Sequence, residues 1–186
     1  MASTAARPGR FHSRRHVLQV SLAATAGLVF APRIGRAKAE ERRLGLVNLH
    51  TGERVEALYW ANGALVDEEL RRVDRLMRDH RNGKVTEIDP RLIDKLWHLG
   101  QAVGARQSFQ LISGYRSPES NARLAASTEG VAEDSFHVRG QAADVRLPGV
   151  DLLDLRRAAR AQHSGGVGYY PFSDFLHLDT GPTRFW

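Results

Sequence analysis

Residues 135–144 read Ser-Phe-His-Val-Arg-Gly-Gln-Ala-Ala-Asp, and residues 175–179 read Phe-Leu-His-Leu-Asp. The two stretches supply two histidines and an aspartate, namely His137, Asp144 and His177. Imidazole nitrogens and carboxylate oxygens are common zinc ligands, and a catalytic zinc has three protein ligands and an open position for water. The two stretches therefore predict a Zn²⁺ site built from these three side chains.

Two of these side chains interrupt apolar strand sequences. Asp144 lies within 142–147, and His177 lies between two leucines. A carboxylate in a buried strand is costly unless it is paired or bound to a metal. Gly140 would let the chain turn so that His137 and Asp144 converge. Spacing alone leaves two alternatives open, an ion pair between Asp144 and an arginine, and a hydrogen-bonded core histidine at His177.

The first 39 residues have the composition of an export signal. They contain seven basic residues and no acidic residue, an apolar run at 17–30, and Ala37-Lys38-Ala39 at the end. The sequence Ser13-Arg14-Arg15-His16-Val17-Leu18 predicts a twin-arginine signal, which directs the export of folded bacterial proteins. The apolar run is shorter than the roughly 20 residues of a membrane-spanning helix, so we expect no stable membrane span after signal removal. A general secretory signal and an uncleaved signal are the alternatives.

Charge and cysteine content narrow the possible partners. The chain has 27 basic and 21 acidic residues, and removal of residues 1–39 leaves 20 basic and 21 acidic ones. The pI of about 10.3 therefore reflects the signal rather than the folded domain, which excludes a nucleic-acid partner. Because the chain has no cysteine, a metal in this exported protein must be bound by histidine and carboxylate.

Residue patterns predict one α+β domain over 40–186, with a mostly antiparallel sheet and flanking helices. The predicted strands and helices do not alternate regularly, so the pattern does not indicate a parallel sheet. A polar loop is expected at 127–134. The predicted strands are 43–49, 55–60, 109–112, 142–147, 165–170 and 175–179, and the predicted helices are 67–80, 90–103, 118–126 and 151–162.

The pattern His137-x-x-Gly140-x-Ala142-x-Asp144, with Ser135 before it and His177 in a later strand, resembles a zinc-peptidase family. That family groups D-Ala-D-Ala carboxypeptidases, lysostaphin-type enzymes and the hedgehog fold. The match covers nearly all of 44–186 and implies a hedgehog-like, D-Ala-D-Ala-peptidase-like fold. Other segments resemble its twin-arginine-exported murein endopeptidase branch, namely Asn48–Glu53, Tyr59-Trp60, Arg78–Arg81, Ile88–Arg91 and Ser113–Ser117.

The resemblance implies that His137, Asp144 and His177 bind Zn²⁺. It also implies that Arg116 and Ser135 hold a carboxylate or carbonyl group of the substrate. A guanidinium suits that role because it binds carboxylates through two hydrogen bonds. A structural ion pair is the alternative for Arg116.

The general base is the position at which this chain departs from the family pattern. Many relatives carry glutamate three residues before the last ligand, or histidine two before it, whereas this chain has Asp174 and Phe175 there. Asp174 is therefore the first candidate for the base. Asp179 lies two residues after His177, on the same face of an extended strand. It is the alternative base, or the carboxylate that orients His177.

These observations predict an exported zinc peptidase of the periplasm or cell envelope. The expected substrates are peptide stems or crosslinks of peptidoglycan, with endopeptidase activity favoured. The alternatives are a metal-containing, catalytically weak cell-wall binding module, a D,D-carboxypeptidase and a hydrolase of non-peptide envelope material. The sequence leaves open which crosslink is cleaved.

Overall fold

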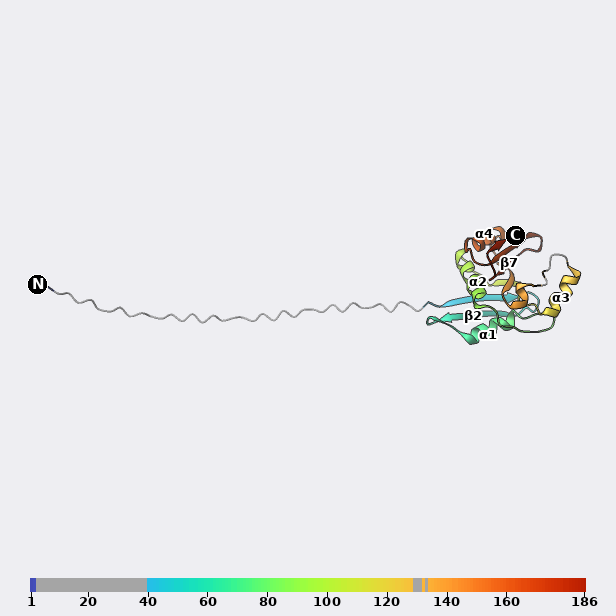
Figure 1. Cartoon of the computed structure of the whole chain (residues 1–186), viewed down its shortest axis with the longest axis horizontal. Coiled ribbons are helices and arrows are strands. Elements are labelled where there is room, and N and C mark those ends of the chain that lie inside the picture. Colours follow the sequence, from blue (N-terminus) through green and yellow to red (C-terminus); the bar gives the residue numbers. More distant parts are fainter. Residues whose placement is uncertain (3–39, 129–131, 133) are drawn as a thin grey trace. The chain divides into compact units, whose positions relative to one another are not determined.

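The computed structural model describes residues 1–2, 40–128, 132 and 134–186, so the predicted export segment lies outside the described residues except for its first two. The unit spanning Arg36–Trp186 is built on one sheet with strand order β3-β2-β1-β4-β5-β7-β6-β8 (Figure 1). The strands are β1 (Arg42–Asn48), β2 (Arg54–Ala61), β3 (Ala64–Leu65), β4 (Phe109–Ser113), β5 (Ala142–Arg146), β6 (Gly166–Tyr170), β7 (Phe175–Asp179) and β8 (Arg184–Phe185). The helices are α1 (Asp67–Leu76), α2 (Pro90–Ala102), α3 (Pro118–Ser127) and α4 (Leu152–Ala161), with the short 3-10 helices η1 (Phe136–Arg139) and η2 (Pro171–Ser173).

Most neighbouring strands run antiparallel. The exceptions among the described residues are the pairs β1–β4 and β6–β8, which are parallel. At the centre, β5 and β7 pair in a regular antiparallel register from Ala142 opposite Asp179 to Val145 opposite Leu176. The predicted α+β fold with a mostly antiparallel sheet is confirmed.

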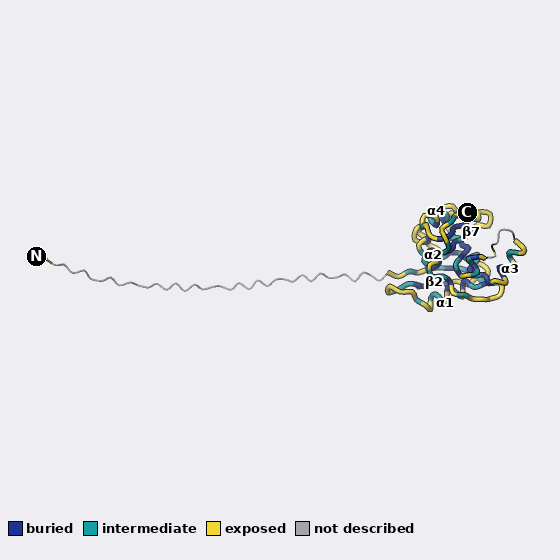
Figure 2. The backbone as a smooth tube through the Cα atoms, viewed as in Figure 1, coloured by how far each residue is buried: buried dark blue, intermediate teal, exposed yellow. Residues whose placement is uncertain are grey.

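The hydrophobic core lies on one face of the central strands. Leu111, Val145, Leu176 and Leu178 are at most 1% exposed and belong to the same core cluster as the apolar residues of α2 and α4. Buried residues are concentrated where strands and helices meet (Figure 2). Because side chains alternate along a strand, the even-numbered positions of β5 and the odd-numbered positions of β7 point to the opposite face. That face carries the candidate site.

Capping residues begin the helices α2, α3 and α4. Asp89 accepts a hydrogen bond from the backbone N–H of Arg91 at the start of α2, and Ser117 does the same for Ser120 in α3. In both helices a proline follows the cap, where its missing N–H costs nothing. None of the helices in the described parts of the chain has the length and apolar character to cross a membrane.

The predicted helix over 67–80 is wrong beyond Leu76. The chain instead turns around Asp79, which is fully buried and accepts hydrogen bonds from the backbone N–H and hydroxyl of Ser117, at 3.0 and 2.7 Å. Burial alone would raise the pKa of Asp79, but the hydrogen bonds from Ser120 and Ser117 lower it to about 2. This tertiary contact outweighs the helical pattern, because a buried carboxylate must keep its donors.

Candidate metal centre

His137 is fixed in place by a short helix with a defined cap at each end. Ser135 caps η1 by accepting a hydrogen bond from the backbone N–H of His137 at 3.3 Å. Gly140 ends η1 in the left-handed conformation, with φ 67°, and a side chain there would clash with the carbonyl oxygen of Glu87. Glycine is therefore required at the turn that leads into β5. The Nδ1 atom of His137 lies 2.7 Å from the carbonyl oxygen of Gly114.

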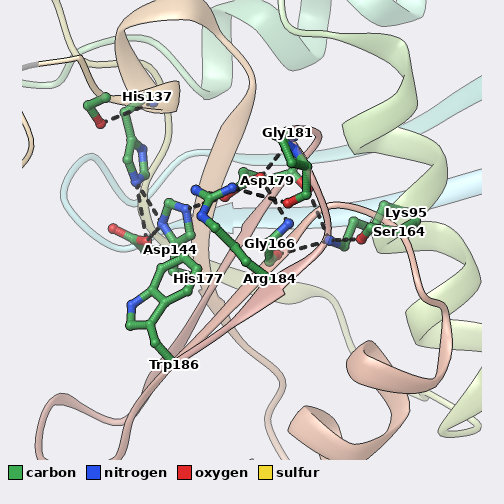
Figure 3. A network of polar contacts seen from close by, with 12 residues as sticks. Lys95, His137, Asp144, Ser164, Gly166, His177, Asp179, Gly181, Arg184 and Trp186 are labelled. Carbon is green, nitrogen blue, oxygen red and sulfur yellow. Dashed lines mark hydrogen bonds and ion pairs between the residues drawn. The ribbon is translucent and has the colours of Figure 1, made fainter.

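Asp144 and His177 are direct neighbours across β5 and β7. The Oδ1 atom of Asp144 lies 2.9 Å from Nδ1 of His177 and 3.3 Å from Nε2 of His137. The two imidazole nitrogens lie 3.2 Å apart. His137 and Asp144 are buried, and His177 is partly buried. The structure thus brings the three predicted ligands together, with their ligand atoms within 4.8 Å of one another (Figure 3).

In each imidazole ring, one nitrogen points away from the cluster and the other points into it. The hydrogen bond of the outward nitrogen determines whether the inward nitrogen carries a proton or a lone pair. The carbonyl oxygen of Gly114 only accepts, so Nδ1 of His137 carries the proton, and Nε2 presents a lone pair. Asp179 contacts Nε2 of His177 at 3.1 Å, and an ionised carboxylate also only accepts, so in the neutral ring Nε2 carries the proton and Nδ1 presents a lone pair. Two lone pairs and a carboxylate oxygen of Asp144 therefore converge. They repel one another unless a proton or a metal cation lies between them.

The electrostatics favour positive charge at this point. Burial opposes ionisation of Asp144, but the charge and hydrogen bonds of His137 and His177 hold its pKa well below the usual range. Burial also lowers the pKa of His177, yet the neighbouring carboxylates of Asp144 and Asp179 raise it overall. In a metal complex the cation would take the place of the shared proton.

Asp179 is a fully buried carboxylate that contacts the Nε2 atom of His177. Its Oδ1 atom accepts hydrogen bonds from the backbone N–H groups of Gly166 and Gly181, at 2.9 and 2.8 Å. Its Oδ2 atom is 2.8 Å from the Arg184 guanidinium and 3.1 Å from His177 Nε2. Burial raises the pKa of Asp179, but His177 and the backbone donors lower it well below the usual range. The contact to Nε2, away from the converging lone pairs, is typical of a carboxylate that orients a metal-binding imidazole.

Lys95 of α2 binds the backbone segments around the Asp179 carboxylate. Its ammonium group donates to the carbonyl oxygens of Ser164, Gly166 and Asp179 and so joins the two strand ends (Figure 3). Lys95 is not among the site residues predicted from the sequence. Its helical spacing from Leu92 and Leu99 was an available signal, because it places the lysine on the buried face of α2.

Arg116 is buried beside the three candidate ligands. Its backbone N–H bonds to the carbonyl oxygen of His137 at 3.2 Å, and one terminal nitrogen donates to Asn121 at 3.0 Å. Burial lowers the pKa of Arg116 against the opposing charge of Asp144. Within the described parts of the chain, its Nε atom is buried without a hydrogen-bond partner. Such a donor is costly unless a ligand or water meets it, so the guanidinium is suited to an incoming carbonyl or carboxylate.

Asp174 lies outside the cluster. It follows η2 in the left-handed conformation, is exposed, and forms a 2.8 Å ion pair with Arg146. Ser135 has a structural contact as the cap of η1, described above. Two further residues near the site, Arg184 and Trp186, had no sequence signal, because their positions depend on how the last strand pairs with β6.

The chain is similar in sequence to known proteins over most of its length. A family model described as peptidoglycan L,D-endopeptidase MepK matches residues 36–186. The chain is 46% identical over 145 residues to the peptidoglycan L,D-endopeptidase MepK of Escherichia coli strain K12, covering 78% of this chain and 80% of that protein. It is 39% identical over 146 residues to a probable peptidoglycan L,D-endopeptidase MepK of Haemophilus influenzae, covering 78% of each.

Proposed function

The chain belongs to the family of MepK peptidoglycan endopeptidases, and we propose that it is a zinc-dependent enzyme that hydrolyses L,D peptide crosslinks of the bacterial cell wall. Family membership supports a peptidase of peptidoglycan. The L,D type of bond follows both relatives, which are named L,D-endopeptidases. Zinc and the roles of individual residues are our own assignments.

The observation that carries the zinc assignment is the convergence of two ring nitrogens and a carboxylate oxygen, from His137, His177 and Asp144. Both outer ring nitrogens are committed as donors, so three acceptors face one another at 2.9 to 3.3 Å. Two imidazoles and a carboxylate suit Zn²⁺, and the absence of cysteine excludes thiolate ligands. Bound zinc would polarise a carbonyl group and lower the pKa of a water molecule to about 7.

The surrounding residues then have separate tasks. Asp179 holds His177 in the tautomer that leaves Nδ1 free for the metal. Arg116 binds a carbonyl or carboxylate of the peptide through its Nε–H, which no other described residue contacts by a hydrogen bond, with Ser135 beside His137 as a second polar group. Asp174 remains our candidate for the general base. To act in that role it would have to leave its ion pair with Arg146 when substrate binds.

The export assignment rests on the sequence of residues 1–39. We propose that this segment is a twin-arginine signal and that 40–186 acts as a single peptidase domain in the periplasm or cell envelope. Replacing Arg14 and Arg15 together by lysine would then retain the protein in the cytoplasm. Continued export of that variant would instead indicate the general secretory route.

Metal analysis and digestion of defined muropeptide dimers test the enzymatic proposal. Purified protein should contain about one zinc per chain and cleave L,D-linked dimers, with products identified by mass spectrometry. His177→Ala should lose both properties, whereas the exposed residue His98 of α2 offers a control, His98→Ala, that should keep them. Metal-bearing protein that binds cell walls without turnover would support the binding-module alternative, and release of a single terminal residue would support a carboxypeptidase.

A further inference from the structure

Aromatic side chains form a continuous strip beside the candidate metal centre. The indole Nε1–H of Trp186 donates to the hydroxyl of Tyr170 at 2.9 Å, and the Tyr170 ring stacks on Phe175 with centroids 4.7 Å apart. We call Trp186, Tyr170 and Phe175 the aromatic strip. Trp186 is 44% exposed and Tyr170 38% exposed. Phe172, in the turn that joins β6 to β7, is fully exposed.

Trp186 is half-exposed but firmly held. Its backbone N–H bonds to the carbonyl oxygen of Val167, and its carbonyl oxygen accepts from Tyr169. The indole lies directly on the backbone of Gly168, since a Cβ atom at that position would come within 2.6 Å of the ring. The Arg184 guanidinium lies 5.0 Å from the ring centroid. A preorganised, accessible ring of this kind loses little freedom when it binds a ligand.

The strip lies on the same sheet face as the metal centre. His177 pairs with Gly168, and Phe175 pairs with Tyr170, so these positions share one face of β6 and β7. The Trp186 ring is 5.4 Å from the His177 ring, and Figure 3 shows the indole beside His177. A substrate bound at the metal centre therefore has the strip as its immediate neighbour.

The chemistry of the strip differs from that of the Arg116 side of the centre. Arg116 offers a buried cation for a carbonyl or carboxylate. The strip instead offers the faces of aromatic rings, with planar polar side chains near Phe175. There, Arg146 binds both Gln110 and Asp174, the residue before Phe175. A β-linked pyranose has matching features, because its axial C–H bonds make a flat apolar face and its hydroxyls lie around the edge.

We propose that the aromatic strip binds sugar rings of the peptidoglycan glycan strand while the peptide lies at the metal centre. This inference rests on the proposed function, since it names a second part of the same substrate. The stem peptide is a poorer match for the strip, because a peptide chain has no flat C–H face to lie on the rings. The enzyme would thus recognise both the strand and the crosslink.

Binding of a sugar without peptide tests the inference. The probe is the β-1,4-linked hexamer of N-acetylglucosamine, titrated by calorimetry into the full-length protein. The variants Trp186→Leu, Tyr170→Leu and Phe175→Leu each remove one ring of the strip. The control is Phe185→Leu, because Phe185 is also 38% exposed but alternates to the opposite face of β8.

We expect the wild type and Phe185→Leu to bind with similar Kd, and the strip variants to bind at least about tenfold more weakly. Sugar binding should also shift the fluorescence of the wild type, and Trp186→Leu should lose this shift because Trp60 and Trp97 lie around Arg42 instead. Zinc content and thermal unfolding are measured for each variant. If one strip variant fails to fold, the other two keep the test decisive, because each removes a different ring.

Absence of hexamer binding by the wild type, or equal binding by all variants, would overturn the inference. The variants are also titrated with a sugar-free crosslinked peptide. If they lose affinity for this peptide as much as for the hexamer, the inference is overturned too. Because the hexamer has no peptide bond between amino acids, its binding does not depend on hydrolysis. Hexamer binding without cleavage of muropeptides would therefore reject the proposed function and leave the strip assignment standing.

Discussion

Replacing Asp179 by asparagine is a sharp test of how the candidate metal centre is organised. The Oδ1 atom of Asp179 accepts two backbone N–H groups, and an asparagine oxygen can keep both bonds. The Oδ2 atom faces two donors, Arg184 and Nε2 of His177, and an amide nitrogen placed there would face them as a third donor. His177 can relieve this contact by moving its proton from Nε2 to Nδ1. That tautomer turns the ligand atom into a donor.

The expected loss follows from the contacts removed. A hydrogen bond to a charged group contributes about 1.5 to 3 kcal/mol, and removal of a carboxylate that orients a metal ligand weakens metal binding about 10- to 100-fold. The two figures agree, since tenfold in affinity corresponds to about 1.4 kcal/mol. We therefore expect Asp179→Asn to raise the zinc Kd by about one to two orders of magnitude.

The assay is a competition between the protein and a chromogenic chelator at fixed pH. Asp79→Asn is a matched control, because Asp79 is also a fully buried, hydrogen-bonded carboxylate but contacts none of the three ligands. The control should lower the free energy of unfolding and leave the zinc Kd unchanged. Unchanged zinc affinity in Asp179→Asn would refute the orienting role, and loss of turnover with full zinc occupancy would identify Asp179 as the base.

Three further variants separate chemistry from structure. Asp174→Asn should lower kcat at least about tenfold with zinc retained if Asp174 is the base, and an unchanged pH profile of kcat would contradict that role. Gly140→Ala should lower the free energy of unfolding in urea by about 1 to 3 kcal/mol, because it combines a left-handed φ with a clash against Glu87. A smaller decrease would mean that the turn relaxes. Burial lowers the pKa of Lys95 from 10.5 to about 8, so between pH 8 and 10.5 the unfolded state binds more protons and stability should rise with pH by up to about 3 kcal/mol. Lys95→Met should abolish that rise, and an equal rise in both proteins would assign it to other groups.

The sequence predicts best those features of the fold that depend on residues close together in the chain. Alternation along 142–147 and 175–179 places Asp144 and His177 on one face, and the antiparallel pairing of β5 and β7 sets them opposite each other. Capping residues mark where α2 and α3 begin. These features depend on neighbours in the chain, which is why sequence patterns can show them.

Features that depend on distant contacts were harder to predict. The helix after Asp67 stops early because Asp79 bonds to Ser117, which lies 38 residues further along the chain. Lys95 reaches the carbonyl oxygen of Asp179 across 84 residues of sequence. The ion pair between Asp174 and Arg146 likewise depends on the register of two strands. Spacing in the sequence cannot give any of these distances.

The converging lone pairs of His137, Asp144 and His177 also have a consequence for the durability of the fold. His137 and His177 are 40 residues apart in sequence, and Asp144 and His177 are 33 apart. A cation shared by them would close the long loop between Asp144 and His177 and cross-link η1, β5 and β7, much as disulfides do in exported proteins. A chain without cysteine would thereby gain a reversible staple, and chelation would expose it to proteases in the compartment where it works.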